Sequence, residues 1–300
     1  MSFEAAAVAE IQARVNARLA KIAPAEQDEA RDLALAMRQG LLAPGKRARA
    51  LTVIMASTAL GGAEDDAMTA ACAIELVHTA SLLLDDLPSM DDARMRRGKP
   101  ATHIVFGEDT AILAAIALLT EAFRIVSEDT RLAPERRTAV VSKIAAASGL
   151  AGLAGGQFLD LRAVADAPQQ AERISSLKTG ALFAAAAWIG GCTAGASETQ
   201  LQALHEFGNS AGTAFQIYDD LADVVTPQTT LGKDVDADAN KATVVSLAGL
   251  AGARALADAR FIEAKERLRS AGIAEGSLDR FMDGLRRKLE ARLATHSSDE

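Results

Sequence analysis

The stretch that decides the fold is LLLDDLPSMDDARMRRGKP, residues 82–100. An uncharged apolar run ends in it, and acidic and basic side chains follow within a few positions: Asp85, Asp86, Asp91, Asp92, Arg94, Arg96 and Arg97. Carboxylates this close repel one another and shift each other's pKa unless something neutralises them. Oxygen ligands suit Mg²⁺, and guanidinium groups grip phosphate oxygens in a bidentate way. The stretch therefore indicates a metal and phosphate site, with a solvated helix end of mixed charge as the alternative.

A second acidic cluster, within residues 215–223, decides between these interpretations. Asp219 and Asp223 are four residues apart, so on a helix they lie on one face, one turn apart, and Gln216 shares that face. Two acids at this spacing with no base beside them destabilise an isolated helix, and a bound metal ion removes the penalty. Two such clusters, each after an apolar helical run, favour the metal site.

Composition predicts one all-α domain over residues 1–300. Apolar residues make up 49% of the chain, aromatics only 4%, and no Pro/Ser/Gly-rich linker divides it. Alanine is abundant and β-branched alternation is hard to find, which favours packed helices. The net charge of −8 argues against a nucleic-acid surface. The N-terminus lacks a basic segment followed by an apolar one, so we expect no signal peptide and a cytoplasmic protein.

One stretch, residues 179–197, carries no charge over nineteen residues and is long enough to raise a membrane span. It is rich in Gly, Ala, Ser and Thr, and Lys178 and Glu198 flank it. We interpret it as a buried core helix and expect no stable membrane insertion.

The apolar pattern predicts further helices over residues 2–22, 27–39, 50–60, 64–84, 109–126, 137–161, 172–180, 198–223, 247–271 and 278–294. Pro88 should end the fourth of these and leave Asp91 on a turn. The adjacent Arg96 and Arg97 must point in different directions, which suits two separate anions better than one.

A basic cluster, residues 45–49, precedes the third helix. Lys46 and Arg49 are three residues apart and can converge on one anion at a helix N-terminus, although a solvated basic turn is the alternative. His78 is seven residues before Asp85 and shares its helical face. It is either a satisfied core histidine or a donor to phosphate.

In this order, the residues resemble the trans-isoprenyl diphosphate synthases, and among them the bacterial geranylgeranyl diphosphate synthases. The resemblance covers nearly the whole chain and rests on these motifs: Gly45-Lys46-Arg47-x-Arg49, His78, Asp85-Asp86 with Asp91, Arg96-Arg97-Gly98-x-Pro100, Gly156-Gln157-x-x-Asp160, Lys178-Thr179, Phe215-Gln216, Asp219-Asp220-x-x-Asp223, Gly232-Lys233-Asp234 and Lys241. Ala50 and Leu84 replace a common proline and a common histidine, and neither position carries chemistry in our interpretation. The family implies an all-α orthogonal bundle around a central cavity, acting as a homodimer.

The resemblance also implies the site. Three magnesium ions, with Mn²⁺ as a substitute, are expected on these carboxylates: Asp85, Asp86, Asp91, Asp219, Asp220 and Asp223. The allylic diphosphate is expected on Arg96, Lys178, Thr179, Gln216, Lys233 and Lys241. The diphosphate of isopentenyl diphosphate is expected, without metal, on Gly45, Lys46, Arg49, His78 and Arg97. The allylic diphosphate leaves, the isopentenyl double bond attacks the cation, and proton loss follows. The residues expected to act directly in catalysis are Lys178, Thr179, Gln216, Asp85 and Asp219.

Product length should depend on the helix that carries the first acidic cluster. Ala80 and Ser81 lie about one turn below Asp85 and are small, whereas Val77 and Ile74 further down are bulky. One isoprene unit spans roughly 5 Å, close to one helical turn. We therefore predict growth past fifteen carbons and arrest near twenty, giving geranylgeranyl diphosphate, with a farnesyl or a longer-chain synthase as the alternative.

Three other classes fit less well. A terpene cyclase would not need a second diphosphate site at Lys46, Arg49 and Arg97. A non-catalytic subunit should have lost one acidic cluster, and this chain keeps both. A di-iron bundle would use Glu-x-x-His pairs on two helices, whereas of the two helices that carry the acids only the one over 64–84 has such a pair, Glu75 with His78.

Overall fold

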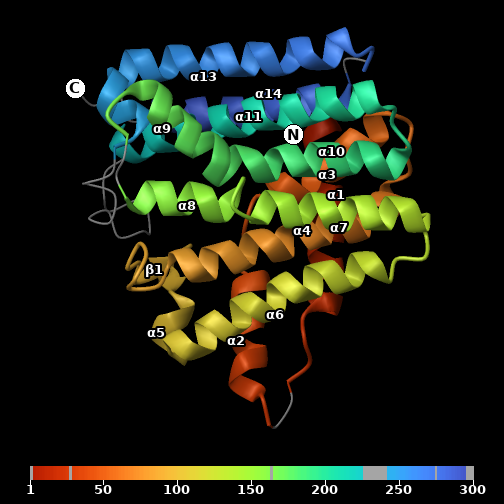
Figure 1. Cartoon of the computed structure of the whole chain (residues 1–300), viewed down its shortest axis with the longest axis vertical. Coiled ribbons are helices and arrows are strands. Elements are labelled where there is room, and N and C mark those ends of the chain that lie inside the picture. Colours follow the sequence, from red (N-terminus) through yellow and green to blue (C-terminus); the bar gives the residue numbers. More distant parts are fainter. Residues whose placement is uncertain (1–2, 27–28, 163–164, 226–241, 274–275, 295–300) are drawn as a thin grey trace. The chain divides into compact units, whose positions relative to one another are not determined.

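The computed structural model describes residues 3–26, 29–162, 165–225, 242–273 and 276–294, and most of them are helical (Figure 1). The helices are α1 (Phe3–Ile22), α2 (Arg31–Leu41), α3 (Ala48–Ala59), α4 (Glu64–Asp85), α5 (Thr102–Phe106), α6 (Glu108–Ser127), α7 (Pro134–Ser148), α8 (Leu153–Leu161), α9 (Pro168–Ser175), the π-helix η1 (Ser176–Gly180), α10 (Ala181–Ala194), α11 (Glu198–Val225), α13 (Val244–Ser270) and α14 (Ser277–Ala294). The strands are β1 (Met95–Arg96) and β2 (Lys99–Pro100). The all-α class predicted from the sequence is confirmed.

Two predicted helices are corrected. The helix expected over 137–161 is divided into α7 and α8 by a turn at residues 149–152. Gly152 lies so close to the carbonyl of Ala147 that a Cβ there would be 2.1 Å from its oxygen, so the turn needs glycine. The helix expected over 172–180 begins earlier, as α9, and continues as the π-helix η1.

Most of the uncharged stretch over residues 179–197 forms the core helix α10, as predicted. Nearly every residue of α10 is buried, and it ends at Gly195, which adopts the left-handed conformation with φ 82°. By length and composition, three other stretches could cross a membrane: α4, α6 and Pro134–Leu161, which holds α7 and α8. Of their most apolar windows, 78%, 33% and 33% of the residues are buried inside the protein. The apolar character of α4 is thus explained by its burial.

The chain divides into two compact units. Unit 1 contains the described residues up to 51 and residues 68–141, and unit 2 contains residues 52–67 and the described residues from 142 onward. The boundaries fall inside α3, α4 and α7. A single domain over residues 1–300 stays a prediction.

Within unit 2, α11 packs against both α10 and α13 (Figure 1). Phe183, Phe207 and Tyr218 are among the largest fully buried side chains of this core. The Tyr218 hydroxyl donates to Asp258 at 2.6 Å, and its ring lies 5.9 Å from that of Phe261. These contacts fix which face of α11 is buried and therefore which face remains open.

Candidate active site

The first acidic cluster forms where α4 ends. The following loop folds back on the helix, because the backbone N–H of Asp91 donates to the carbonyl of Asp85 at 2.9 Å and that of Ala93 to the carbonyl of Asp86 at 3.2 Å. Asp91 is thereby held beside Asp85, and both side chains are partly exposed. Two carboxylates thus lie at one end of α4, where they can receive a cation.

Asp86 has a different environment, since it is only 2% exposed. Its carboxylate accepts a hydrogen bond from Nε of Arg96 at 2.8 Å and another from Nη2. Burial raises the pKa of Asp86 above its usual value, and the Arg96 guanidinium offsets part of that shift. Asp86 therefore fixes Arg96 next to the acidic cluster.

The two adjacent arginines contact different groups. Arg96 is in β1, whereas Arg97 and Gly98 form the two-residue turn to β2 with φ of 54° and 75°. A Cβ added to Gly45 would lie 2.9 Å from Nη1 of Arg97, so the guanidinium rests directly against this glycine. Arg96 thus lies beside the acidic cluster, whereas Arg97 lies against the basic loop, residues 45–49, whose last two residues are in the first turn of α3.

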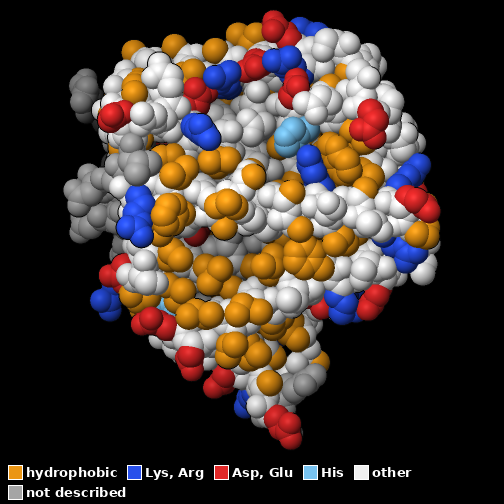
Figure 2. Space-filling view, in the orientation of Figure 1, with side chains coloured by type: hydrophobic (Ala, Val, Ile, Leu, Met, Phe, Trp, Pro, Cys, Tyr) orange, Lys and Arg blue, Asp and Glu red, His pale blue; other side chains and the backbone are white. Residues whose placement is uncertain are grey.

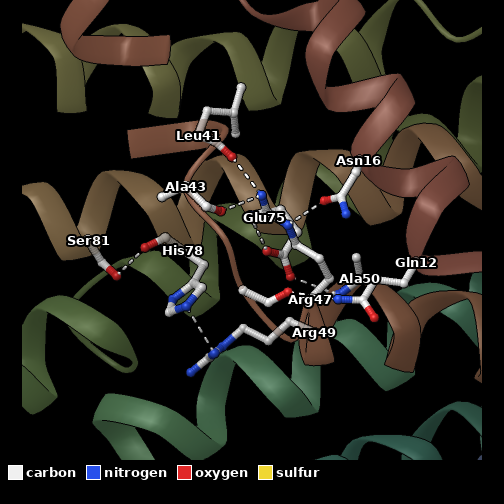
Figure 3. A network of polar contacts seen from close by, with 11 residues as sticks. Gln12, Asn16, Leu41, Ala43, Arg47, Arg49, Ala50, Glu75, His78 and Ser81 are labelled. Atoms are coloured by element: carbon white, nitrogen blue, oxygen red, sulfur yellow. Dashed lines mark hydrogen bonds and ion pairs between the residues drawn. The ribbon is translucent and has the colours of Figure 1, made fainter. Parts of the chain in front are cut away.

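The basic loop meets α4 at His78. Nη1 of Arg49 lies 3.2 Å from Nε2 of His78 (Figure 3). A guanidinium can only donate, so Nε2 is the acceptor and the imidazole is neutral. Burial, followed by the charges of Arg49, Arg97 and Arg47, holds the pKa of His78 well below 6.5. Together with the exposed Lys46, these groups form a positively charged surface suited to an anion.

The second acidic cluster lies on the open face of α11. Gln216, Asp219, Asp220 and Asp223 are partly exposed, while the intervening residues 217, 218, 221 and 222 are buried. The helical spacing predicted from the sequence is therefore the one that the helix adopts. Since the buried face is fixed by α10 and α13, the carboxylates cannot rotate inward.

A chain of hydrogen bonds joins this cluster to η1. The hydroxyl of Thr179 donates to Oε1 of Gln216 at 2.7 Å, and Nε2 of Gln216 donates to Oδ1 of Asp220 at 2.7 Å. Both polar atoms of the Gln216 amide are thereby engaged. The orientation of the Gln216 amide is fixed because its oxygen accepts from Thr179 and its nitrogen donates to Asp220.

Lys178, also in η1, pairs with Asp160 of α8 at 2.7 Å. The two helices approach closely at Gly156, where a Cβ would lie 2.5 Å from the backbone nitrogen of Lys178. One turn before Asp160, the amide of Gln157 is buried, and neither its oxygen nor its nitrogen has a hydrogen-bond partner among the described residues. π-helical turns often occur at functional sites, and this one carries Lys178 and Thr179.

The residues predicted to limit product length differ in exposure. Ile74, Val77 and Ala80 are buried, whereas Ser81 is partly exposed and its hydroxyl donates to the carbonyl of His78 at 2.9 Å. Ser81 is four residues before Asp85 and therefore shares its face of α4. Of the four, Ser81 is thus the one presented beside the acidic cluster.

The predicted site residues fall into two groups. Unit 1 holds Gly45, Lys46, Arg49, His78, Asp85, Asp86, Asp91, Arg96 and Arg97, and unit 2 holds Lys178, Thr179, Gln216, Asp219, Asp220 and Asp223. Lys233 and Lys241 lie outside the described residues. Within the described ranges, no three His, Cys, Asp or Glu side chains are close enough to form a metal site by themselves.

Sequence reasoning assigned no role to Arg47 or Glu75, which form a buried ion pair in unit 1 with Nη1 and Oε2 3.4 Å apart. Glu75 is the one acidic residue in the run from Ala67 to Leu84. A single acid inside a long apolar helix is a signal that could have identified it.

The fold and these motifs define a class of protein, and comparison with known proteins identifies it. Residues 31–270 match the family model described as polyprenyl synthetase, so the chain belongs to this family. It has the all-α isoprenoid synthase fold.

Among its relatives are geranylgeranyl diphosphate synthases from Pantoea ananas and from Pseudescherichia vulneris. The first is 42% identical over 249 residues, covering 81% of this chain and 80% of the relative. The second is 40% identical over 272 residues, covering 89% and 87%. A solved geranyltransferase from Helicobacter pylori, complexed with magnesium and isoprenyl diphosphate, superposes with a TM-score of 0.85 at 27% identity over 97% of this chain and 99% of that one.

Proposed function

We propose that this protein is a trans-prenyltransferase that condenses isopentenyl diphosphate with an allylic diphosphate and makes geranylgeranyl diphosphate. The names of the relatives support this function. The observation that carries it is the separation of Arg96 from Arg97. Because one arginine pairs with Asp86 and its neighbour rests on Gly45, the chain offers guanidinium groups to two diphosphates. A reaction with a single diphosphate substrate would not need two arginines in separate places.

Magnesium fits the acidic residues. The donors are all carboxylate oxygens, which is the set that Mg²⁺ prefers, and the Helicobacter pylori structure contains magnesium. We place three ions on Asp85, Asp91 and Asp219, with Asp86, Asp220 and Asp223 ordering or completing their shells, and with Mn²⁺ as a substitute. Bound magnesium supplies Lewis-acid stabilisation of the charge that develops on the leaving diphosphate.

The allylic substrate is assigned to the residues around the acidic clusters. Arg96 and Lys178 bind its diphosphate, together with Lys233 and Lys241. Arg96 is paired with Asp86 and Lys178 with Asp160, and the substrate can replace these carboxylates as partner. Lys178, for example, lies 2.7 Å from Asp160. Thr179 and Gln216 direct oxygen dipoles at the cation, and their mutual hydrogen bond holds both in place before substrate arrives.

Isopentenyl diphosphate is assigned to the basic loop. Lys46, Arg49 and Arg97 supply three positive charges, Gly45 lets the Arg97 guanidinium approach, and the neutral His78 supplies an uncharged donor. A neutral imidazole between arginines avoids a further repulsive charge when no anion is bound. Attack by the isopentenyl double bond on the allylic cation then forms the new bond, and proton loss restores a double bond.

The chain length of the product is assigned to the face of α4 below Asp85. Ser81 is small there and leaves room for the growing chain, whereas Val77 and Ile74 are bulky enough to stop it lower down, with Ala80 beside them. Arrest near twenty carbons gives geranylgeranyl diphosphate, in agreement with the names of the relatives.

We further propose a cytoplasmic homodimer that binds no nucleic acid and does not insert stably into membranes. Five large apolar residues are exposed on α5 and α6 of unit 1: Ile104, Val105, Ile112, Leu113 and Ile116. Figure 2 shows apolar side chains gathered over α6. Exposed patches of this kind usually mark an interface, and a second copy would cover this one. Sedimentation at micromolar concentration should give the mass of a dimer.

Two matched variants test the assignment of two diphosphates. Arg96→Lys should raise the KM of the allylic substrate, and Arg97→Lys the KM of isopentenyl diphosphate, because each variant loses a bidentate grip on one anion. Steady-state kinetics with one substrate varied and the other saturating measures both. The assignment is wrong if both variants raise the KM of the same substrate only.

A further inference from the structure

Arg47 lies in the middle of the basic loop but faces the protein interior. It is only 5% exposed, whereas Lys46 before it is exposed and Arg49 after it is partly exposed. A buried guanidinium needs several acceptors to offset the loss of water. Its function should therefore be found in its contacts within the protein.

Those contacts use all three nitrogens of the side chain (Figure 3). Nε donates to Oδ1 of Asn16 at 2.9 Å, and Nη1 donates to Oε2 of Glu75 at 3.4 Å. Nη2 donates to the carbonyls of Leu41 and Ala43, both at 2.9 Å. The side chain thus joins α1, the end of α2 and α4 to the loop that carries Lys46 and Arg49.

The backbone of Arg47 is also specialised. Its φ of 50° is in the left-handed region, which side chains other than glycine adopt only under constraint. Its carbonyl accepts the first helical hydrogen bond of α3, from the N–H of Leu51 at 2.9 Å. The chain therefore enters α3 through a residue in the left-handed conformation, and the four side-chain contacts hold Arg47 in that conformation.

Glu75 fixes the other side of the loop. It is 2% exposed, and while Oε2 faces Arg47, Oε1 accepts from the backbone N–H of Ala50 at 3.1 Å. The first N–H groups of a helix lack partners within it, and a carboxylate there also interacts favourably with the helix dipole. Glu75 thus ties the start of α3 to α4 one turn before His78.

The N-terminal helix supplies a second attachment. Nε2 of Gln12 donates to the carbonyl of Gly45 at 2.8 Å, and Asn16, one turn further along α1, accepts from Arg47. Both residues precede the part of the chain, residues 31–270, that matches the family model. Gln12 holds the glycine against which Arg97 rests, and Asn16 holds Arg47.

We propose that Arg47 is a positioning residue. Held by Glu75 and Asn16, and assisted by Gln12, it fixes the loop whose Lys46 and Arg49 bind the diphosphate of isopentenyl diphosphate. The proposal rests on the proposed function. It makes α1 a support of the substrate site, acting through Gly45 and Arg47.

Two isosteric substitutions on α1 give opposite expectations. Gln12→Glu removes the donor to Gly45, so the KM of isopentenyl diphosphate should rise at least fivefold with the allylic KM within twofold. Asn16→Asp keeps the acceptor for Arg47, so both KM values should stay within twofold of wild type. Each variant adds one negative charge to the same helix, so a general effect of charge or stability would change both alike. Gln12→Met, which lacks the donor without adding charge, should match Gln12→Glu.

Glu75→Gln extends the test to the buried pair. It should raise the KM of isopentenyl diphosphate more than tenfold, whereas Asp129→Asn, which alters another buried carboxylate of unit 1 that pairs with Arg131, should leave that KM within twofold. Thermal melts establish that each variant is folded. If Glu75→Gln does not fold, the Gln12 and Asn16 variants decide whether the loop is positioned from within the protein.

The outcomes separate the two proposals. Active wild-type enzyme with an unchanged KM in Gln12→Glu and Gln12→Met would overturn the positioning role alone. A parallel rise in both KM values, or equal effects of Gln12→Glu and Asn16→Asp, would overturn it too. Wild-type protein that forms no prenyl diphosphate would instead contradict the proposed function.

Discussion

Thr179 donates a 2.7 Å hydrogen bond to the side-chain oxygen of Gln216, which joins the π-helix η1 to the helix of the second acidic cluster. Gln216 passes this constraint on, because its nitrogen donates to Asp220. A chain of two hydrogen bonds thus fixes the orientations of a hydroxyl, an amide and a carboxylate. Such preorganised dipoles stabilise developing charge without having to reorient during the reaction.

Disrupting this chain of hydrogen-bonded dipoles should slow the chemical step. Gln216→Leu is expected to lower kcat about 100-fold, the order of magnitude found for the loss of one preorganised dipole. Both KM values should change little, because the dipoles face the cation and not the diphosphates. Thr179→Ser keeps the hydroxyl and serves as the control with near-normal kcat. Steady-state kinetics would contradict the role if Gln216→Leu raised KM with kcat unchanged.

Both acidic clusters should be needed for turnover. Asp85→Asn and Asp219→Asn are each expected to lower kcat by about 10³ or more, because charge stabilisation at the leaving diphosphate is lost. Asp92→Asn alters an exposed carboxylate in the same loop as Asp91 and should remain near wild type. Circular dichroism checks that the folds are intact. Near-normal activity of either main variant, or full activity in a chelator, would contradict metal-assisted ionisation.

His78 should make the protein less stable in acid. Its pKa is held well below 6.5 in the fold by burial and by Arg49, Arg97, Arg47 and Arg96, so below pH 6.5 the unfolded chain binds more protons. The free energy of unfolding therefore falls with decreasing pH, by at most about 1.4 kcal/mol per pH unit for this group.

His78→Gln should remove that part of the slope. Urea denaturation at pH 7.5, 6 and 5 measures it for both proteins. Burial also lowers the pKa of His205, but His205 is present in both proteins, so the difference in slope reports His78 alone. Equal slopes would show that His78 is not held neutral by the fold.

Product length should respond to the open face of α4. Ser81→Phe places a ring beside Asp85 on a partly exposed position and is expected to shift the main product to farnesyl diphosphate, while Ser81→Ala should change nothing. Ala80→Tyr should also shorten the product, but it inserts a ring into a buried position and should cost about 1–3 kcal/mol of stability. Ile74→Ala with Val77→Ala should lengthen the product. Chromatography of dephosphorylated products reads out all four, and an unchanged product in Ser81→Phe would place the limit on another helix.

Much of this fold follows from hydrophobic periodicity. The predicted helix over 64–84 is α4 to within one residue, and 198–223 is α11 to within two. The break between α7 and α8 was missed because the alanines and glycines around it continue the apolar pattern. The hairpin of β1 and β2 was missed because two-residue strands have no detectable alternation. The π-helical turn was missed because it does not change which residue types occur.

The candidate site was predictable where chemistry depends on local spacing. Asp219 and Asp223 share a face because helical geometry requires it. The burial of Arg47 was not predictable in this way, because a lysine and an arginine flank it and a basic run of this kind is usually exposed to solvent. Its burial depends on Asn16 and Glu75, which are 31 and 28 positions away in sequence. Contacts of this range are set by tertiary packing.

The central claim is best tested by the product of the purified wild-type protein. Incubation with magnesium, dimethylallyl diphosphate and excess isopentenyl diphosphate, followed by dephosphorylation and chromatography, should give the twenty-carbon alcohol geranylgeraniol as the main product. Absence of any elongated product would contradict prenyl transfer. A main product of fifteen carbons, or one clearly longer than twenty, would contradict the assignment of geranylgeranyl diphosphate.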